Sequence, residues 1–518
     1  MKGCHSREVN VSFTGIAFAP SSDEPLYRQL FDQIVARIRS GTFPAGYRLP
    51  PTRSFATELS THRNTVVHAY EELEAAGFVR STVGRGTFVV APPPPAPGME
   101  SQDPHARAGL PWASLISNSL NVERLDRSER MARAPTPPGA INLNRMQPPP
   151  DLLPCELFRR CVDHVLRSVG PRALEYTPRE GLLRLRGLIA EDLARQGVPA
   201  AAEDLIITTG SQQALDMVAR ALIDPGNPFL VDLSTYAGAL NLLAVAGARL
   251  IGVPSDEEGP AVSELEKQAR IGAKGFYLMP NCQNPTGRRV SLERREALVR
   301  WSHDSGVPLI EDDYASDLNL DGQPPLPALR TLDGDVIYMG TYSKKLIPAL
   351  RIGYLLCPRT LRPMIAALKQ AMDLGSSALL QHALAEFIDR GYLRAHLGAV
   401  QAEYRRRRDA LEVALAKHLP RSAQWDHPQS GLVLWLRTPV SIDPEDLYQE
   451  AQRQGVLISP GTLNGVATSG QRGVRLTFCA EPPSRLAEGA RRLGKAWSVL
   501  ERRARGRVGG SSARLEAV

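Results

Sequence analysis

The chain has 518 residues, of which 43% are hydrophobic and 23% charged, and a formal net charge of +7. This length predicts two or three domains, and the composition is typical of a soluble globular protein. No apolar run reaches the roughly 18 residues of a membrane span, and the first residues lack a signal-peptide pattern, so we expect a cytoplasmic protein without membrane contact.

Six cysteines are scattered without a C-x-x-C pair or histidines at metal-binding spacing. We therefore expect neither a disulfide framework nor a metal site. The positive net charge suggests a polyanionic partner. Between Glu24 and Val90, however, eight arginines face six acids, so charge alone does not identify a DNA-binding domain.

The first predicted element is a helix over Pro25–Ser40, where apolar residues recur at helical spacing. A turn leads to a short helix over Ser54–Leu59, and three residues connect it to a longer helix over Arg63–Ala76. Two helices joined by such a turn allow the second to enter a major groove of DNA. The segment Gly77–Val90 has two apolar runs around a glycine pair, which predicts a β-hairpin, the wing.

The run from Leu49 to Val90 resembles the GntR-type winged helix-turn-helix domain, an α+β fold. We assign residues 23–90 to it, after an N-terminal extension of residues 1–22. The resemblance implies binding to a double-stranded DNA operator through arginines, the exposed start of the recognition helix and the wing tip. It assigns these roles to Arg53, Arg63, Asn64, Thr65, Arg85 and Gly86. The turn departs from the family pattern at Ser60, Thr61 and His62, which leaves the base contacts near His62 open.

Residues 91–140 are rich in proline and poor in periodic apolar positions, which predicts a semi-extended linker between two modules. Beyond it, short apolar strands alternate with helical stretches, the pattern of a mostly parallel sheet wrapped by helices. The predicted strands are Asp204–Thr208, Phe229–Val231, Gly275–Met279, Pro308–Glu311 and Val336–Met339. We expect a large α/β domain over 141–372, a small α+β subdomain over 373–500 and a disordered tail over 501–518.

The most specific motif of the second module lies in Gly340–Gly353, which follows the pattern S-K-x3-P-x2-R-x-G. A pyridoxal-phosphate (PLP) site needs an amine for a Schiff base and a cation for the phosphate dianion. Lys344 fits the amine and Arg351 fits the phosphate clamp. Lys345 competes locally for the role of the amine, but choosing it breaks the spacing of the motif.

Together with this motif, four other segments resemble pieces of the PLP site in fold-type I aminotransferases. The resemblance gives the pyridine nitrogen to Asp312, at the end of a strand, where α/β sheets place ligands. It also assigns phosphate binding to Ser211 and Gln212, which begin a helix, and to the hydroxyls of Thr341 and Ser343. It implies that Tyr314 and Asn284 hydrogen-bond the ring hydroxyl of PLP and that Tyr236 stacks on the face of the pyridine ring.

Two further positions bear on partners of the PLP module. Tyr176 resembles the tyrosine that reaches the phosphate of the neighbouring subunit, which implies a dimer. Arg475 resembles the arginine that binds a substrate carboxylate in a bidentate fork, and Arg472 is a nearby alternative.

Both modules together resemble the MocR subfamily of GntR-type transcriptional regulators, from about Pro25 to Trp497. This resemblance implies a head-to-tail homodimer in which PLP, and an amino compound as effector, changes how the DNA-binding domains are presented. Two alternatives stay open at this point. One is an active aminotransferase with an accessory DNA-binding domain, and the other is an architectural DNA-binding dimer that has lost PLP, which Lys344 and Asp312 disfavour.

Overall fold

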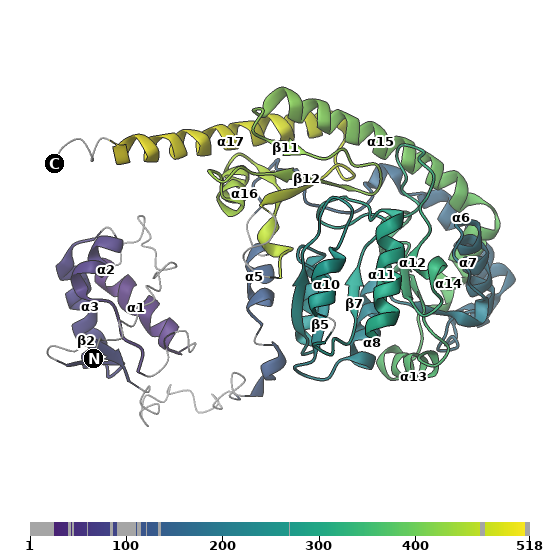
Figure 1. The fold of residues 1–518 in the computed structure, drawn as a ribbon, viewed down its shortest axis with the longest axis horizontal. Helices are drawn as coiled ribbons and strands as arrows, with labels where there is room; N and C mark the ends of the chain where they lie inside the picture. The colour runs from purple at the N-terminus through teal and green to yellow at the C-terminus, as the bar shows by residue number, and fades with distance from the viewer. Residues whose placement is uncertain are drawn as a thin grey trace. The chain divides into compact units, whose positions relative to one another are not determined.

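The computed structural model describes residues 25–39, 43, 46–59, 61–82, 86–90, 110, 115–120, 122–132, 136–268, 270–466 and 472–512. The chain divides into a unit of Met1–Ser114 and a unit of Leu115–Val518, which we treat separately (Figure 1). Within the described ranges, no helix is both long and apolar enough to cross a membrane.

The first unit is a small three-helix fold with a hairpin, as expected for a winged helix-turn-helix domain. Its elements are α1 (Leu26–Arg39), α2 (Thr52–Glu58), α3 (Arg63–Ala75), β1 (Val79–Thr82) and β2 (Gly86–Val89). The hairpin pairs antiparallel, with Val79 opposite Val89. Apolar side chains from all three helices, among them Leu30, Phe55 and Leu73, are fully buried in one core. The apolar residues that recur at helical spacing therefore pack α3 against α1 and α2.

The second unit begins before the predicted end of the linker, and this corrects the boundary at residue 140. Helix α5 (Glu123–Ala132) lies inside the segment that we expected to be extended. Arg124 of this helix donates hydrogen bonds to the backbone carbonyls of Leu463 and Gly465 at 2.7 and 2.6 Å, and Asn241 donates one to Ser128 at 2.9 Å. The helix is therefore held by contacts with the second unit.

The large part of the second unit is an α/β layer structure. In the described residues it holds a seven-stranded sheet of order β4-β10-β9-β8-β7-β5-β6, in which only β10 runs antiparallel to its neighbours. The strands are β4 (Leu205–Thr208), β5 (Pro228–Asp232), β6 (Arg249–Val253), β7 (Phe276–Leu278), β8 (Leu309–Asp313), β9 (Ile337–Thr341) and β10 (Gly353–Leu356). All five strands expected from the sequence are present, and the parallel order brings their carboxyl ends to one edge.

Helices pack on both sides of this sheet. They are α6 (Cys155–Ser168), α7 (Leu183–Arg195), α8 (Ser211–Leu222), α9 (Ala237–Val245), α10 (Val262–Gln268), α11 (Leu292–Ser305), α12 (Leu329–Leu332), α13 (Arg362–Asp373) and α14 (Ala378–Asp389). Helix α14 shares a buried apolar cluster with α6 and α7. It therefore belongs with the large part by packing, although we expected the small subdomain to begin at residue 373.

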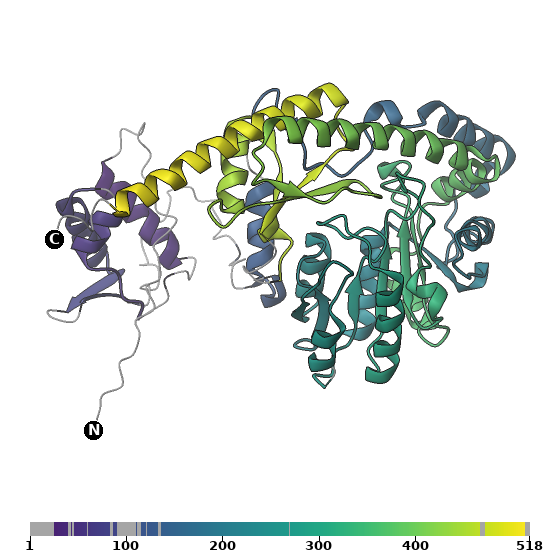
Figure 2. The same ribbon diagram turned by 45° about the horizontal axis from the view of Figure 1, so that its top comes forward.

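The small subdomain is α+β, as predicted. Its described strands form an antiparallel sheet of order β11-β12-β15-β14, covered by helices of which α15 and α17 run side by side (Figures 1 and 2). The elements are β11 (Gln424–Trp425), β12 (Val433–Arg437), β14 (Ser459–Pro460), β15 (Gly473–Thr477), α15 (Tyr392–His418), α16 (Pro444–Arg453) and α17 (Pro483–Ser512). The disordered tail expected from residue 501 is wrong in part, because α17 continues to Ser512; no proline follows Pro483 to interrupt the helix.

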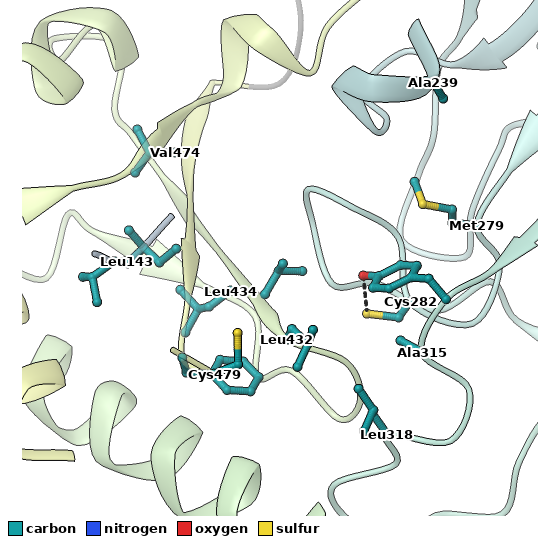
Figure 3. Packing of buried hydrophobic residues seen from close by; sticks show 14 of the residues in the cluster. Leu143, Ala239, Met279, Cys282, Ala315, Leu318, Leu432, Leu434, Val474 and Cys479 are labelled. Carbon is teal, nitrogen blue, oxygen red and sulfur yellow. Dashed lines mark hydrogen bonds between the residues drawn. The ribbon is translucent and has the colours of Figure 1, made fainter. Parts of the chain in front are cut away.

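The start of the large domain also packs with the small sheet. Strand β3 (Ile141–Asn142) pairs in parallel with β13 (Val456–Leu457). Leu143 lies in the same buried cluster as Leu434, Val474 and Cys479 (Figure 3). The cluster continues into the large part, so the segment after residue 141 connects the small sheet to the edge where the strands of the large sheet end.

Candidate functional site

Lys344 follows β9 and lies in a cavity at the carboxyl edge of the large sheet. Its Nζ donates a hydrogen bond to the carbonyl oxygen of Met146 at 2.8 Å. Burial, helped by the positive charges of Arg475 and Arg351, lowers the pKa of Lys344. A lysine with a lowered pKa is more often the neutral amine that a nucleophile must be. The cavity is lined by Met146, Ser211, Gln212, Tyr236, Met279, Asn284, Asp312, Tyr314, Thr341, Ser343, Lys344 and Arg351.

Lys345, the competing lysine of the motif, lies elsewhere. It is buried and forms an ion pair with Asp317, and its Nζ lies 5.0 Å from the centre of the Tyr342 ring. Burial alone would lower the pKa of Lys345, but Asp317 raises it well above its usual value. Lys345 is thus held as a charged structural group and does not line the cavity.

One end of the cavity is suited to an anion. Gly210, with φ of 79°, precedes α8 and has no side chain to cap it, so the N–H groups of Ser211 and Gln212 have no partner within the helix. Arg351 lies across this end, with Nη1 3.3 Å from the Ser343 hydroxyl, to which it donates, and Nη2 donating to the Thr209 carbonyl at 3.3 Å. A Cβ atom on Gly210 would lie 2.8 Å from Arg351 Nη2, so this position needs glycine for its backbone angle and for the approach of the guanidinium.

The same end holds hydroxyl groups. Thr341 and Ser343 are buried, and the backbone N–H of Ser343 donates to the Thr341 hydroxyl at 3.2 Å. Gln212 lies beside them in the lining, and its side-chain amide donates to the Gly238 carbonyl at 3.1 Å. The predicted phosphate ligands are therefore brought together at one end of the cavity.

Asp312, in β8, has one satisfied and one unsatisfied oxygen. Tyr277 donates a hydrogen bond to Oδ2 at 2.6 Å, whereas Oδ1 is buried and has no partner among the described residues. Burial raises the pKa of Asp312 to about 6, although the Tyr277 hydrogen bond opposes the rise. An unpaired carboxylate oxygen in a cavity is costly unless a ligand supplies a donor.

Two donors of the cavity point to sulfur atoms. The Asn284 side-chain amide donates to Met146 Sδ at 3.6 Å, and the Tyr314 hydroxyl donates to Cys282 Sγ at 3.3 Å, the bond drawn as a dashed line in Figure 3. Sulfur is a weak acceptor. Both donors can therefore turn to a ligand oxygen at little cost.

Tyr236 directly precedes α9 and lines the cavity. It is half-buried, and its ring occupies the space that a side chain at Gly238 would need. Burial raises the pKa of Tyr236. Its ring therefore stays neutral and forms part of the cavity wall.

Arg475, rather than Arg472, reaches the cavity region. From β15 it donates through Nη1 to Asn284 Oδ1 at 3.0 Å and through Nη2 to the carbonyl oxygen of Asn144 at 3.2 Å and to the side-chain Oδ1 of the same residue at 2.5 Å. Its Nε is buried without a partner in the described residues. Arg472 instead donates to the backbone carbonyls of Val440 and Ile442.

Tyr176 lies on the surface of the unit and is 85% exposed. It is too exposed to belong to the cavity of its own chain and is absent from the lining. Other large apolar residues of this unit are also exposed. Leu166, Leu174, Leu183 and Leu374 are each more than 40% exposed, and the first three lie within ten residues of Tyr176 in the sequence.

The start of α3 in the first unit is exposed. Arg53, Arg63 and Asn64 have exposed side chains, and Thr65 is half-buried. His62, the departure from the family pattern, acts as the helix N-cap, because its Nδ1 accepts a hydrogen bond from the Asn64 backbone N–H at 3.3 Å. The turn is thus compatible with the helix start despite the unusual residue.

In the wing, Arg85 lies outside the described residues. Gly86 has a φ of 113°, and a Cβ atom there would lie 2.8 Å from Nε of Arg48. Arg48 is exposed and bridges through its backbone to Phe88 of β2. Arg48 belongs to none of the sequence motifs, so its place as a cation beside the wing was not predicted.

Comparison with known families agrees with this division. Residues 26–89 match the model of bacterial regulatory proteins of the gntR family, and residues 142–493 match that of aminotransferase class I and II. The chain is 34% identical over 483 residues to a probable rhizopine catabolism regulatory protein, MocR, of Rhizobium meliloti, covering 93% of this chain and 95% of that protein. The chain belongs to the MocR subfamily of GntR-type transcriptional regulators.

The second unit of this MocR-type regulator is also similar to working enzymes. It is 31% identical over 398 residues to a 2-aminoadipate transaminase of Thermus thermophilus, covering 76% of this chain and 98% of the enzyme. A solved α-aminoadipate aminotransferase of the same species, in complex with N-(5'-phosphopyridoxyl)-L-leucine, has a TM-score of 0.69 and 30% identity over 76% of this chain and 99% of that one. The family and these relatives imply PLP as the cofactor.

The structure shows residues in and beside the cavity of the MocR-type regulator that the sequence did not indicate. Met146 supplies its backbone oxygen to Lys344 and its sulfur to Asn284, Tyr277 holds Asp312, and Asn144 holds Arg475. Each is far from its partner in sequence and belongs to no local motif. Only the folded chain brings them together.

Proposed function

We propose that this regulator binds PLP in the cavity around Lys344 and uses it to sense an amino compound that carries a carboxylate. The observation that carries the proposal is the buried Asp312 Oδ1, which lacks a partner in the described residues, while the half-buried Lys344, whose pKa is lowered, lines the same cavity. A protonated pyridine nitrogen is the donor that this oxygen needs, and an aldehyde is the group that the lysine would bind.

The donor set fits the rest of PLP as well. Arg351, the hydroxyls of Thr341 and Ser343 and the start of α8 would hold the phosphate. Asn284 and Tyr314 would turn from sulfur to the ring hydroxyl. Tyr236 would pack on the ring. Each part of the cofactor therefore has a chemically matched partner.

Bound PLP would supply an aldehyde carbon that exchanges reversibly between amines and a ring that draws electrons from it. Lys344 would hold that carbon in the resting protein. An effector's primary amine can take the place of Lys344 Nζ, and the lysine then leaves as the free amine, so the exchange consumes neither oxidant nor water. Once freed, Lys344 would no longer tie that carbon to the segment after β9. The effector-bound and effector-free proteins would then differ in the contacts of this segment, which allows an effector to favour one conformation.

Arg475 supports a carboxylate on the effector. Arg475 is half-buried with a buried Nε, yet in the described residues no aspartate or glutamate forms an ion pair with it, and its partners are amide oxygens. A cation that is partly withdrawn from water and has no anionic partner favours a ligand that brings a negative charge. An aminocarboxylate would place its amine at Lys344 and its carboxylate at Arg475.

We further propose a head-to-tail homodimer in the cytoplasm that binds operator DNA. Tyr176 and the apolar residues Leu174 and Leu183 are exposed, which supports a surface that a second subunit covers in the dimer. Because Tyr176 does not line the cavity of its own chain, it can reach the cavity of the neighbouring subunit. Arg53 of α2 and Arg63, Asn64 and Thr65 at the start of α3 would contact DNA, together with Arg85 and Gly86 of the wing. We propose that the protein is located in the cytoplasm because it binds DNA.

Two experiments test this function. Addition of PLP to the apoprotein should give the visible absorbance of a lysine Schiff base, and an effector amine should change both that absorbance and the affinity for the protein's own upstream DNA. Absence of any PLP-dependent absorbance would refute cofactor binding. Salt-independent or absent DNA binding would refute the regulator.

A second candidate function is transamination. It is favoured by the complete set of Asp312, Lys344, Asn284 and Arg475 around one cavity. If the protein converts amino donors and 2-oxo acids with a kcat of about 1 per second or more, it is an enzyme as well as a regulator. We expect turnover far below this rate.

A further inference from the structure

Met146 lies between the two groups that would hold the ends of an effector. Its backbone oxygen accepts a hydrogen bond from Lys344 Nζ at 2.8 Å, and its Sδ lies 3.6 Å from the side-chain nitrogen of Asn284. The oxygen of the same Asn284 side chain accepts from Arg475 Nη1 at 3.0 Å. Lysine, methionine, asparagine and arginine thus form a continuous row.

This row fixes what an aminocarboxylate must contact. Its nitrogen would replace Lys344 Nζ and its carboxylate would approach Arg475, so the carbon joining the two must pass Met146. Arg475 itself is not part of the cavity lining, whereas Met146 and Asn284 are. The methionine side chain thus contacts Asn284, the lining residue that in turn contacts the guanidinium.

We propose that Met146 is the residue that determines effector specificity, by limiting the substituent on the carbon next to the effector nitrogen. The proposal rests on the proposed function. Small aminocarboxylates, with hydrogen or methyl on that carbon, fit once the thioether turns aside. Leucine or phenylalanine would place a large side chain in the volume that Met146 fills.

The chemistry of methionine suits a selective but movable barrier. The side chain is unbranched and flexible, and its weak hydrogen bond to Asn284 is lost at little cost. We expect its volume to remain in the cavity after it turns, because Met146 is half-buried and its backbone is held: the Met146 carbonyl accepts from Lys344, and the carbonyl of the preceding Arg145 accepts from Thr477 and Cys479. A hydrophobic site rejects excess volume by a limited factor, about 10- to 200-fold for a methylene-sized difference.

The test is a calorimetric titration of the PLP-loaded full chain with glycine, alanine, leucine and phenylalanine. In the natural protein we expect glycine or alanine to bind at least about tenfold more tightly than leucine. Met146→Ala should improve leucine and phenylalanine binding by about 10- to 200-fold and change glycine binding little. Met146→Leu, which keeps the volume but removes sulfur, should retain the preference of the natural protein.

The outcomes separate this inference from the proposed function. Visible absorbance of bound PLP in all three proteins shows that the cofactor site is intact, and loss of effector preference in Met146→Ala alone supports the inference. Three results would overturn the inference. They are equal affinity of the natural protein for alanine and leucine, no binding of either amino acid by any variant, and an unchanged ratio of alanine to leucine affinity in Met146→Ala. Failure to bind PLP at all would overturn both proposals.

Discussion

Replacing Asp312 by asparagine should have opposite effects on the apoprotein and on PLP binding. The carboxylate is buried, its Oδ1 has no partner in the described residues, and its pKa is raised from 3.8 to about 6 by burial. Because the folded state holds the proton more tightly, the free energy of unfolding falls as pH rises from about 4 to about 6 and stays lowered above that range. The shift of about two pKa units corresponds to roughly 3 kcal/mol.

At pH 8, Asp312→Asn should therefore stabilise the apoprotein by up to about 3 kcal/mol, since an amide carries no buried charge and still accepts from Tyr277. The same change removes the carboxylate that would bind a protonated pyridine nitrogen. A hydrogen bond to a charged group contributes about 1.5–3 kcal/mol, so PLP affinity should fall by about 10- to 150-fold.

The assay is denaturant unfolding of apoprotein at pH 5 and pH 8, followed by PLP titration at pH 8. Asp232→Asn is the matched control, because Asp232 is also buried with a pKa raised to about 6, but its oxygens accept from Ser255 and Gln283 outside the cavity. That variant should keep PLP affinity. A lower stability of apo Asp312→Asn at pH 8, together with unchanged PLP affinity, would refute the role given to this carboxylate.

Three further predictions concern the phosphate, the partner subunit and DNA. Arg351→Ala should weaken PLP binding about 10- to 150-fold by titration, through loss of a charge-assisted contact; equal affinity would contradict the phosphate role. Tyr176→Phe should weaken PLP binding by up to about tenfold while sedimentation shows an unchanged dimer, and a monomeric natural protein would contradict the shared site. Arg63→Ala should weaken DNA binding in anisotropy titrations and reduce the salt slope by about one. Arg220→Ala, an exposed arginine of α8, is its control and should change neither value.

The parts of the fold and site that local patterns encode were predictable. The strands with continuous apolar runs and the spacing from Lys344 to Arg351 lie within short segments, so they can be recognised without the fold. The choice of Lys344 over Lys345 followed from spacing, and the structure adds a reason, because Lys345 is paired with Asp317. The same holds for Asp312 at the end of its strand.

Features that depend on long-range contacts were not predictable. Helix α5 was missed because it lies in a proline-rich segment and is held through Arg124 by carbonyls more than 300 residues away. Met146 and Tyr277 were missed because each acts on a residue of another element. His62 looked unfavourable by type, but its ring nitrogen caps α3, which depends on its rotamer and not on the residue pattern.

The most direct test of the central claim is to locate the bound cofactor. Borohydride reduction of the PLP-loaded full chain, followed by peptide mapping in a mass spectrometer, would fix the cofactor to the lysine that holds it. We predict labelling at Lys344 in the natural protein and in Lys345→Arg, which keeps a cation beside Asp317, and no labelling in Lys344→Ala. Labelling at Lys345, or labelling that persists in Lys344→Ala, would contradict the account.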